Sequence, residues 1–227
     1  MSRPELEPHE DRPDTIWIEM PIRIGSVLEP FESAGPEAAR EAAWAMVLAD
    51  AMGLLAGERD VGRLDLESVR RVARAAGQAG IGVAAAAELG GRHPRPERLR
   101  RALRNLREAL EDSPAPASEL PALAGLLGPE ALARLLGVSP ASLRRYAAGA
   151  RPTPDEVAAR AHHLARVVAD LKGAYSDVGV RRWFGRRRTA LGGRSPAQVL
   201  RGPWSPEDAG PARVLELARS LAWSPAT

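Results

Sequence analysis

Apolar side chains recur every three or four residues through most of this chain, a spacing that gathers them on one face of an α-helix. The clearest case is the series Leu99, Leu103, Leu106 and Leu110. Similar spacing predicts helices over residues 36–56, 66–76, 81–89 and 95–111, and a run of short helices after residue 128. Only 4% of the 227 residues are aromatic, and a core of Leu, Ala and Val suits helices better than strands. We therefore expect a mainly α protein.

One segment near the N-terminus alternates apolar and other residues, as a β-strand does. Pro21 lies within it and cannot donate to a strand ladder, so this would be an edge strand or an exchanged arm. We expect it to pair with the same strand of a second subunit, in a homodimer or higher homo-oligomer. The acidic residues 1–15 are expected to form a flexible tail. The alternating apolar residues are Ile16, Ile18, Met20, Ile22 and Ile24.

Prolines divide the chain into two parts. Three prolines fall within residues 113–121, and this density favours extended chain over helix. We therefore predict a linker at 113–121, after a helical N-terminal region (16–112) that could serve in oligomerisation or sensing. A second helical domain is predicted over 122–172 and a small helical domain over 173–227. Later helices have explicit starts, such as Ser139-Pro140 and Ser195-Pro196, where a capping residue precedes a proline in the first turn.

Residues 129–148 predict a helix-turn-helix. Gly137 lies between two short helical patterns, where a sharp turn needs a residue that tolerates positive φ. A further apolar series at residues 157–171 predicts a helix that completes the core, and His162 and His163 are interpreted as ordinary residues of that helix. The side chains spaced to pack the first two helices together are Leu132, Leu136, Val138, Leu143 and Tyr146.

With those side chains inside, the second helix would present its remaining residues to a DNA groove. Ser142 could bond several bases, and Arg144 or Arg145 could take guanine in a bidentate pair or hold a phosphate. The alternative is that both arginines merely solvate a helix face, but the joint pattern favours DNA. The predicted DNA-contacting residues are Pro140, Ala141, Ser142, Arg144, Arg145 and, for the backbone, Arg151.

Charge is distributed unevenly although the net charge is only +3. Lys172 is the only lysine, so nearly all positive charge is arginine, a trend that GC-rich codons would also produce. Acidic residues crowd the N-terminal arm, whereas residues 178–205 carry no acid. A block of one sign usually marks a partner surface. The arginines in this block are Arg181, Arg182, Arg186, Arg187, Arg188, Arg194 and Arg201.

Several functional classes are disfavoured. The chain has no cysteine, and hence no disulfide or thiolate chemistry, and no apolar run long enough to span a membrane. The N-terminus does not resemble a secretory signal, so a cytoplasmic location is expected. Gly80-Ile81-Gly82 superficially resembles a dinucleotide fingerprint, but a helix rather than a strand is predicted before it. We find no metal-ligand cluster or nucleophile motif, so neither an enzyme nor a cofactor is expected.

From about residue 126 to 222 the chain resembles the Xre/MbcA/ParS antitoxin family. Its Leu-Gly-Val-Ser turn at 136–139, followed by Arg151-Pro152, is similar to the Xre-like half of that family. The order of Arg182-Trp183-Phe184, a Leu-Gly-Gly-Arg-Ser-Pro run at 191–196 and a final helix at 212–222 is similar to the toxin-binding half. The Leu-Gly-Gly-Arg-Ser-Pro run is the most specific piece.

The resemblance implies a DNA-binding antitoxin that represses its own operon and blocks a partner toxin, often an NAD-consuming RES-domain protein. Trp183 and residues 192–195 could instead simply hold the small domain together. The N-terminal 112 residues lie outside the resemblance, and the arginine block is unusually basic for a surface that binds only protein. The alternative function is therefore a stand-alone helix-turn-helix regulator with no toxin. Residues at or beside the implied toxin contact are Trp183, Arg188, Gly192, Gly193, Arg194 and Ser195.

Overall fold

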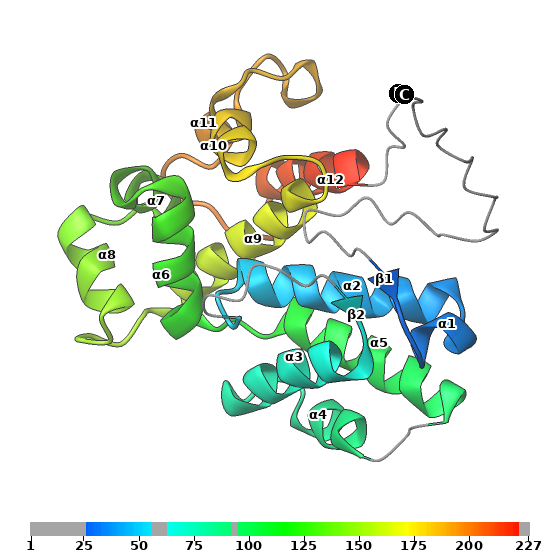
Figure 1. Ribbon diagram of the computed structural model, residues 1–227. Helices are drawn as coiled ribbons and strands as arrows, with labels where there is room; N and C mark the ends of the chain where they lie inside the picture. Colours follow the sequence, from blue (N-terminus) through cyan, green and yellow to red (C-terminus); the bar gives the residue numbers. More distant parts are fainter. Residues whose placement is uncertain (1–25, 56–62, 92–94, 223–227) are drawn as a thin grey trace, which may run out of the picture.

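A computed structural model describes residues 26–55, 63–91 and 95–222 and confirms a mainly helical protein, with 72% helix (Figure 1). The predicted tail (1–15) and strand (16–24) lie outside the described residues. A short parallel pair joins β1 (Ser26–Val27) to β2 (Arg63–Leu64). The helices are α1 (Phe31–Ala34), α2 (Pro36–Ala51), α3 (Leu66–Gln78), α4 (Val83–Gly90), α5 (Pro96–Asp112), α6 (Pro116–Leu127), α7 (Pro129–Leu136), α8 (Pro140–Ala147), α9 (Asp155–Lys172), α10 (Asp177–Gly185), α11 (Pro196–Val199) and α12 (Ala209–Ala222), with a 3-10 turn η1 (Thr189–Leu191) between α10 and α11.

The N-terminal helices form one layer around α2 and α5, which pack lengthwise against each other (Figure 1). The predicted leucine series of α5 is confirmed as its core face, because all four leucines are fully buried. Asp65 caps α3, as expected from its position just before the apolar pattern. Its carboxylate accepts a hydrogen bond from the Ser68 backbone N–H at 2.8 Å. The sequence pattern therefore locates these helices and their contact faces.

Helix α2 ends at Ala51, five residues before the predicted end at residue 56. Gly53 follows with a φ of +72°, and a Cβ at this position would lie 2.6 Å from the carbonyl oxygen of Ser118. Only glycine fits such an approach without a shift of the backbone. The chain leaves the helix here because α6 packs against the turn.

The predicted extended linker at 113–121 is wrong from residue 116 onward, because that stretch begins α6. Pro116 occupies the first turn, where its missing N–H costs nothing, and Pro121 is tolerated inside the helix. Leu120 and Leu123 are fully buried against neighbouring helices. Burial of such leucines stabilises by about 1.5–3 kcal/mol each, comparable to the cost of an internal proline.

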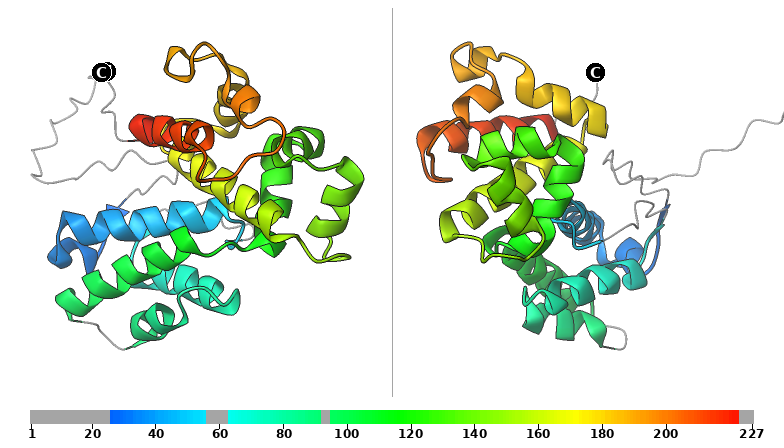
Figure 2. Two further views of the ribbon diagram at one scale, coloured as in Figure 1. Left: turned by 180° about the vertical axis from the view of Figure 1, so that it is seen from behind. Right: turned by 90° about the vertical axis from the view of Figure 1, so that its left-hand side faces the viewer.

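Helix α9 joins the N-terminal helices to the helices of the C-terminal part of the chain. It contacts α2, α6 and α12, and its side chains from Ala161 to Ala165 are all buried (Figure 2). Lys172 at its end forms an ion pair with Asp50 at the end of α2. One hydrophobic cluster runs from Phe31 to Ala218. The predicted boundary between the N-terminal region and the DNA-binding domain therefore does not separate two cores.

No helix within the described ranges is both long and apolar enough to cross a lipid bilayer.

Candidate nucleic-acid interface

The two short helices predicted from the sequence are present as α7 and α8, at one end of the molecule (Figure 1). Gly137 ends α7 in the left-handed conformation, with φ of +71°. The Val138 backbone N–H donates to the Ala133 carbonyl at 3.0 Å, which closes the last turn of α7. Leu132, Leu136 and Leu143 are buried between the helices, as the pattern predicts. The chain here forms two helices joined by a sharp turn.

Helix α8 begins at a capped N-terminus. The backbone N–H of Ser142 donates to the Ser139 side-chain oxygen at 3.1 Å, and Pro140 occupies the first helical position. The Ser139 hydroxyl also lies 3.0 Å from that of Ser142. Ser139 is therefore a capping residue, and Ser142 is half-buried and already engaged in a local hydrogen bond.

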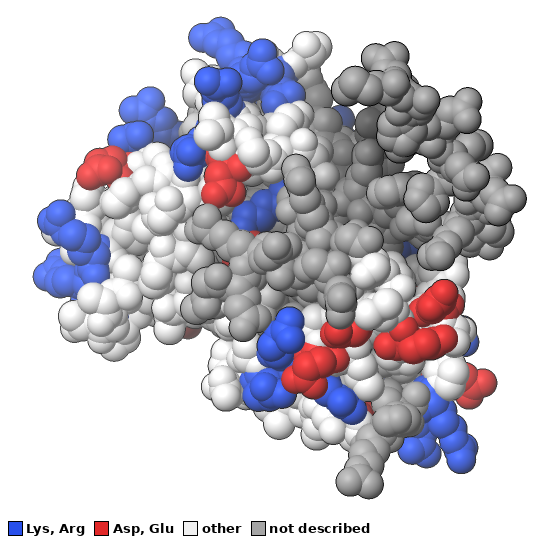
Figure 3. Space-filling model, viewed as in Figure 1, with Lys and Arg blue, Asp and Glu red and all other residues white. Residues whose placement is uncertain are grey.

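The outer face of α8 presents positive charge to solvent. Arg144 and Arg145 are exposed, and neither has an ion-pair partner within the described part of the chain. Pro140 and Ala141, one turn earlier, are also exposed and leave room for close approach. Figure 3 shows arginine side chains gathered over this end of the molecule. The predicted contact residues of α8 thus share one surface, with Ser142 at its edge.

Arg151, just beyond α8, is exposed and lies over the ring of Tyr146, with its guanidinium carbon 5.8 Å from the ring centroid. Tyr146 itself is 7% exposed and belongs to the core. Stacking on a fixed ring holds the guanidinium near α8 while leaving its donors available. Arg151 is therefore positioned at the same surface.

Two side chains that the sequence interpretation missed hold the end of α7, and we call Arg160 and Trp204 the α7 brace. Arg160 donates from Nε to the Trp204 carbonyl at 2.6 Å and from Nη1 to the Leu136 carbonyl at 3.0 Å. The Trp204 indole N–H donates to the Leu135 carbonyl at 2.9 Å. The guanidinium of Arg160 lies over the indole, 5.7 Å from its centroid.

The α7 brace satisfies carbonyls that a helix C-terminus otherwise leaves without partners. Its bonds join residues 24 to 69 positions apart, so no local pattern in the sequence reports them. Trp204 follows α11, so the segment before α12 fixes the turn that leads into α8. The predicted domains at 122–172 and 173–227 are thus joined through this turn.

The predicted toxin-contact residues divide into buried and exposed groups. Trp183 is 1% exposed and Ser195 is 4% exposed, the latter capping α11 through its bond with the Gln198 backbone. Arg188 lies over the Trp183 ring, 5.4 Å from its centroid. Burial of these side chains favours the alternative interpretation, in which they hold the small domain together. Gly192, Gly193 and Arg194 are exposed at the tip of the same loop.

His162 is more than an ordinary helix residue. Its Nδ1 lies 2.7 Å from Oε1 of Glu119 in α6, and its Nε2 lies 2.7 Å from the Glu111 carbonyl at the end of α5. Glu119 is fully buried. His162 therefore links α9 to α6 and to the end of α5. No group of three or more candidate metal ligands occurs within the described residues.

No family model, curated protein sequence or solved structure matches the chain.

Proposed function

We propose that this protein is a DNA-binding transcription regulator that reads duplex DNA with α8. The observation that carries the proposal is the braced helix pair, which turns Leu143 and Tyr146 inward and leaves Arg144 and Arg145 outward without ion-pair partners in the described structure. A helix of this kind fits the major groove, where its first turns meet base edges. A homodimer on a two-fold symmetric site is the expected binding form.

Each exposed side chain has a role in this proposal. Arg144 and Arg145 would pair with the O6 and N7 acceptors of guanine or hold flanking phosphates, because a guanidinium offers parallel donors. Pro140 and Ala141 would pass close to the bases, and Ser142 could add a hydrogen bond after leaving Ser139. Arg151 would hold a phosphate from its place over Tyr146.

The test is a comparison of two double variants on a duplex selected from a random library by the wild-type protein. Arg144→Ala/Arg145→Ala should lower affinity for the selected duplex by roughly 5- to 150-fold for each guanine pair removed. Affinity for a scrambled duplex should fall less, so sequence preference shrinks. Arg100→Ala/Arg104→Ala removes two exposed arginines of α5 and serves as the matched control. Equal affinities for the first variant and the wild type, by fluorescence anisotropy, would refute the proposal.

A second candidate function is that of an antitoxin that represses its own operon and neutralises a toxin. The loop 192–194 favours it: two glycines in the left-handed conformation place Arg194 at an exposed tip, where it could pair with acidic groups of a partner. The family resemblance implies an NAD-consuming RES-domain protein as that partner, in the cytoplasm. Co-expression with the product of the adjacent gene tests this candidate, which fails if wild-type protein neither relieves toxicity nor binds that product.

A further inference from the structure

A strongly basic surface lies apart from α8, and we call it the arginine face. Its members come from α10, from the turn that follows α10 and from the segment between α11 and α12, and all are exposed. Figure 3 shows basic side chains gathered at the top of the molecule, above α10 and α11 of Figure 1. The arginine face consists of Arg181, Arg182, Arg186, Arg187 and Arg201.

None of the arginines of the arginine face forms an ion pair with an acid among the described residues. No Asp or Glu occurs from Val178 to Ser205. The Arg181 guanidinium donates to the Leu126 carbonyl at 3.0 Å, while the side chains of the other four have no hydrogen-bond or ion-pair partner within the described residues. A group of exposed guanidinium charges without ion-pair partners favours a partner with several negative charges.

Such a partner could be a nucleic acid or an acidic protein, and the composition of the arginine face distinguishes between them. Protein interfaces are built around aromatic or apolar groups that lose water on binding. The aromatic residues of α10 are not accessible for that purpose, because Trp183 is 1% and Phe184 is 4% exposed, and Val178 is the one large apolar side chain of α10 that is exposed. A phosphate backbone needs only charge and hydrogen-bond donors, which guanidinium groups supply. The arginine face therefore fits nucleic acid better than an acidic protein.

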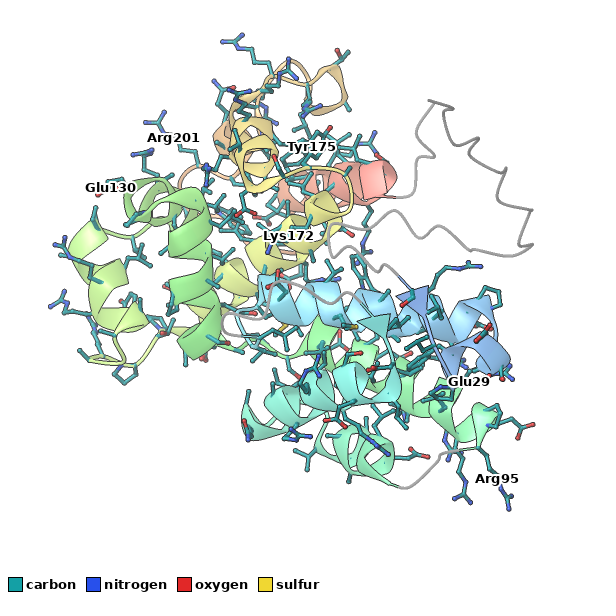
Figure 4. All side chains as sticks on the ribbon, viewed as in Figure 1. Glu29, Arg95, Glu130, Lys172, Tyr175 and Arg201 are labelled. Atoms are coloured by element: carbon teal, nitrogen blue, oxygen red, sulfur yellow. The ribbon has the colours of Figure 1, made fainter. Side chains whose placement is uncertain are left out.

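The arginine face also adjoins the helix-turn-helix. Arg181 bonds the last turn of α6, immediately before α7. Figure 4 labels Arg201, which lies between α11 and α12, at the same upper-left part of the view as Glu130 in the first turn of α7. In the view of Figure 3, basic side chains lie over the end of the molecule that carries α8 and over the top that carries α10, with an acidic patch between them.

We propose that the arginine face binds the phosphate backbone of duplex DNA next to the site contacted by α8. The proposal rests on the DNA binding proposed above and assigns to this surface a sequence-independent contact. Its contribution is electrostatic: each phosphate neutralised releases a condensed counterion, so affinity gains a defined salt dependence. The base contacts of α8 would set the register while the arginine face adds affinity.

The experiment measures affinity as a function of salt for Arg186→Ala/Arg187→Ala on the selected and scrambled duplexes. We expect the slope of log affinity against log salt to become shallower by roughly 0.9 for each phosphate that the variant no longer neutralises, on both duplexes. The preference for the selected duplex should remain unchanged. Arg100→Ala/Arg104→Ala, two exposed arginines of α5, should leave the slope as in the wild type. Circular dichroism checks that the variants are folded.

Two results would overturn the proposal. A wild-type slope and affinity for Arg186→Ala/Arg187→Ala would show that the arginine face does not touch DNA, and would leave an acidic protein as its partner. A loss confined to the selected duplex would make these arginines base-reading residues instead. Failure of the α8 assignment has a different signature, because Arg144→Ala/Arg145→Ala would then bind normally while the arginine-face variant lost affinity for both duplexes.

Discussion

At the residue scale, Asp170 is the most perturbed acid in the described structure. It is 1% exposed on α9, and neither carboxylate oxygen has a hydrogen-bond partner. The nearest cation is Arg219, whose Nε lies 3.6 Å from Oδ2. Burial raises the pKa of Asp170 from 3.8 to about 7, and the attraction of Arg219 and Arg166 offsets only part of that rise. The folded chain therefore holds this proton more tightly than the unfolded chain.

Asp170→Asn should consequently stabilise the protein at neutral pH. Because the folded pKa lies above the unfolded value, ionisation of Asp170 costs stability as pH rises from about 4 to 7, and the cost is complete above pH 7. A gap of about three pKa units corresponds to roughly 4 kcal/mol. Urea unfolding at pH 5 and pH 8 should therefore show a larger gain for the variant at pH 8.

The wild type alone does not reveal the effect of Asp170, because His163 changes the pH dependence of stability in the opposite direction. Burial lowers the pKa of His163 from 6.5 to about 4, so the folded state loses stability as pH falls through that interval. The two slopes partly cancel in the wild type between about pH 4 and 6.5. Asp112→Asn, at an exposed aspartate of α5, is the control. A stability gain for Asp170→Asn that does not change with pH would contradict the assignment.

At the scale of elements, the turn between α7 and α8 depends on the α7 brace. A Cβ at Gly137 would lie 3.3 Å from both the Gly202 carbonyl oxygen and Nη1 of Arg160. Gly149, just after α8, has a similar φ of +65° but no atom within 4 Å of the same position. Both glycines have a positive φ, but only Gly137 has other atoms close to the position that a Cβ would take.

Gly137→Ala should therefore destabilise the protein more than Gly149→Ala. Both variants carry the cost of a left-handed alanine, about 1–2 kcal/mol. Gly137→Ala must in addition displace Arg160 or the chain at Gly202, which would disturb the start of α8 and weaken DNA binding. Thermal unfolding and anisotropy titrations of the two variants measure these effects. Equal losses of melting temperature would show that the α7 brace does not constrain the turn.

The elements themselves were largely predictable from the sequence, and the contacts between them were not. Capping residues such as Asp65 and Ser139 and the periodic leucines of α5 act within a few residues, so their pattern locates the helices. The prediction of extended chain at 113–121 was wrong because the burial of Leu120 and Leu123 against distant helices outweighs the local preference of proline for extended chain. The α7 brace and the His162–Glu119 pair join distant residues, and the sequence carries no local signal for such contacts.

At the scale of the whole molecule, the helices α7 and α8 do not form a separate unit. Helix α9 completes the core beneath α7 and also packs against α2 and α12. His162 bonds Glu111 of α5 and Glu119 of α6, and the α7 brace reaches from the segment before α12. The predicted regions 16–112, 122–172 and 173–227 therefore all contribute described residues to the surroundings of α9.

We expect this shared core to make the full chain unfold as one cooperative unit. The calorimetric enthalpy of unfolding should equal the van't Hoff enthalpy. Unfolding of either the N-terminal helices (α1 to α5) or the later helices (α6 to α12) would expose the buried residues of α9. His162→Ala should shift this single transition to lower temperature without splitting it, since the bonds of His162 to α5 and to α6 are removed together. Two separable transitions in the wild type would mean that the halves are stable independently. In that case the N-terminal helices could not influence the position of α8 through the core, and any sensing role for them would require a direct contact with DNA or a partner.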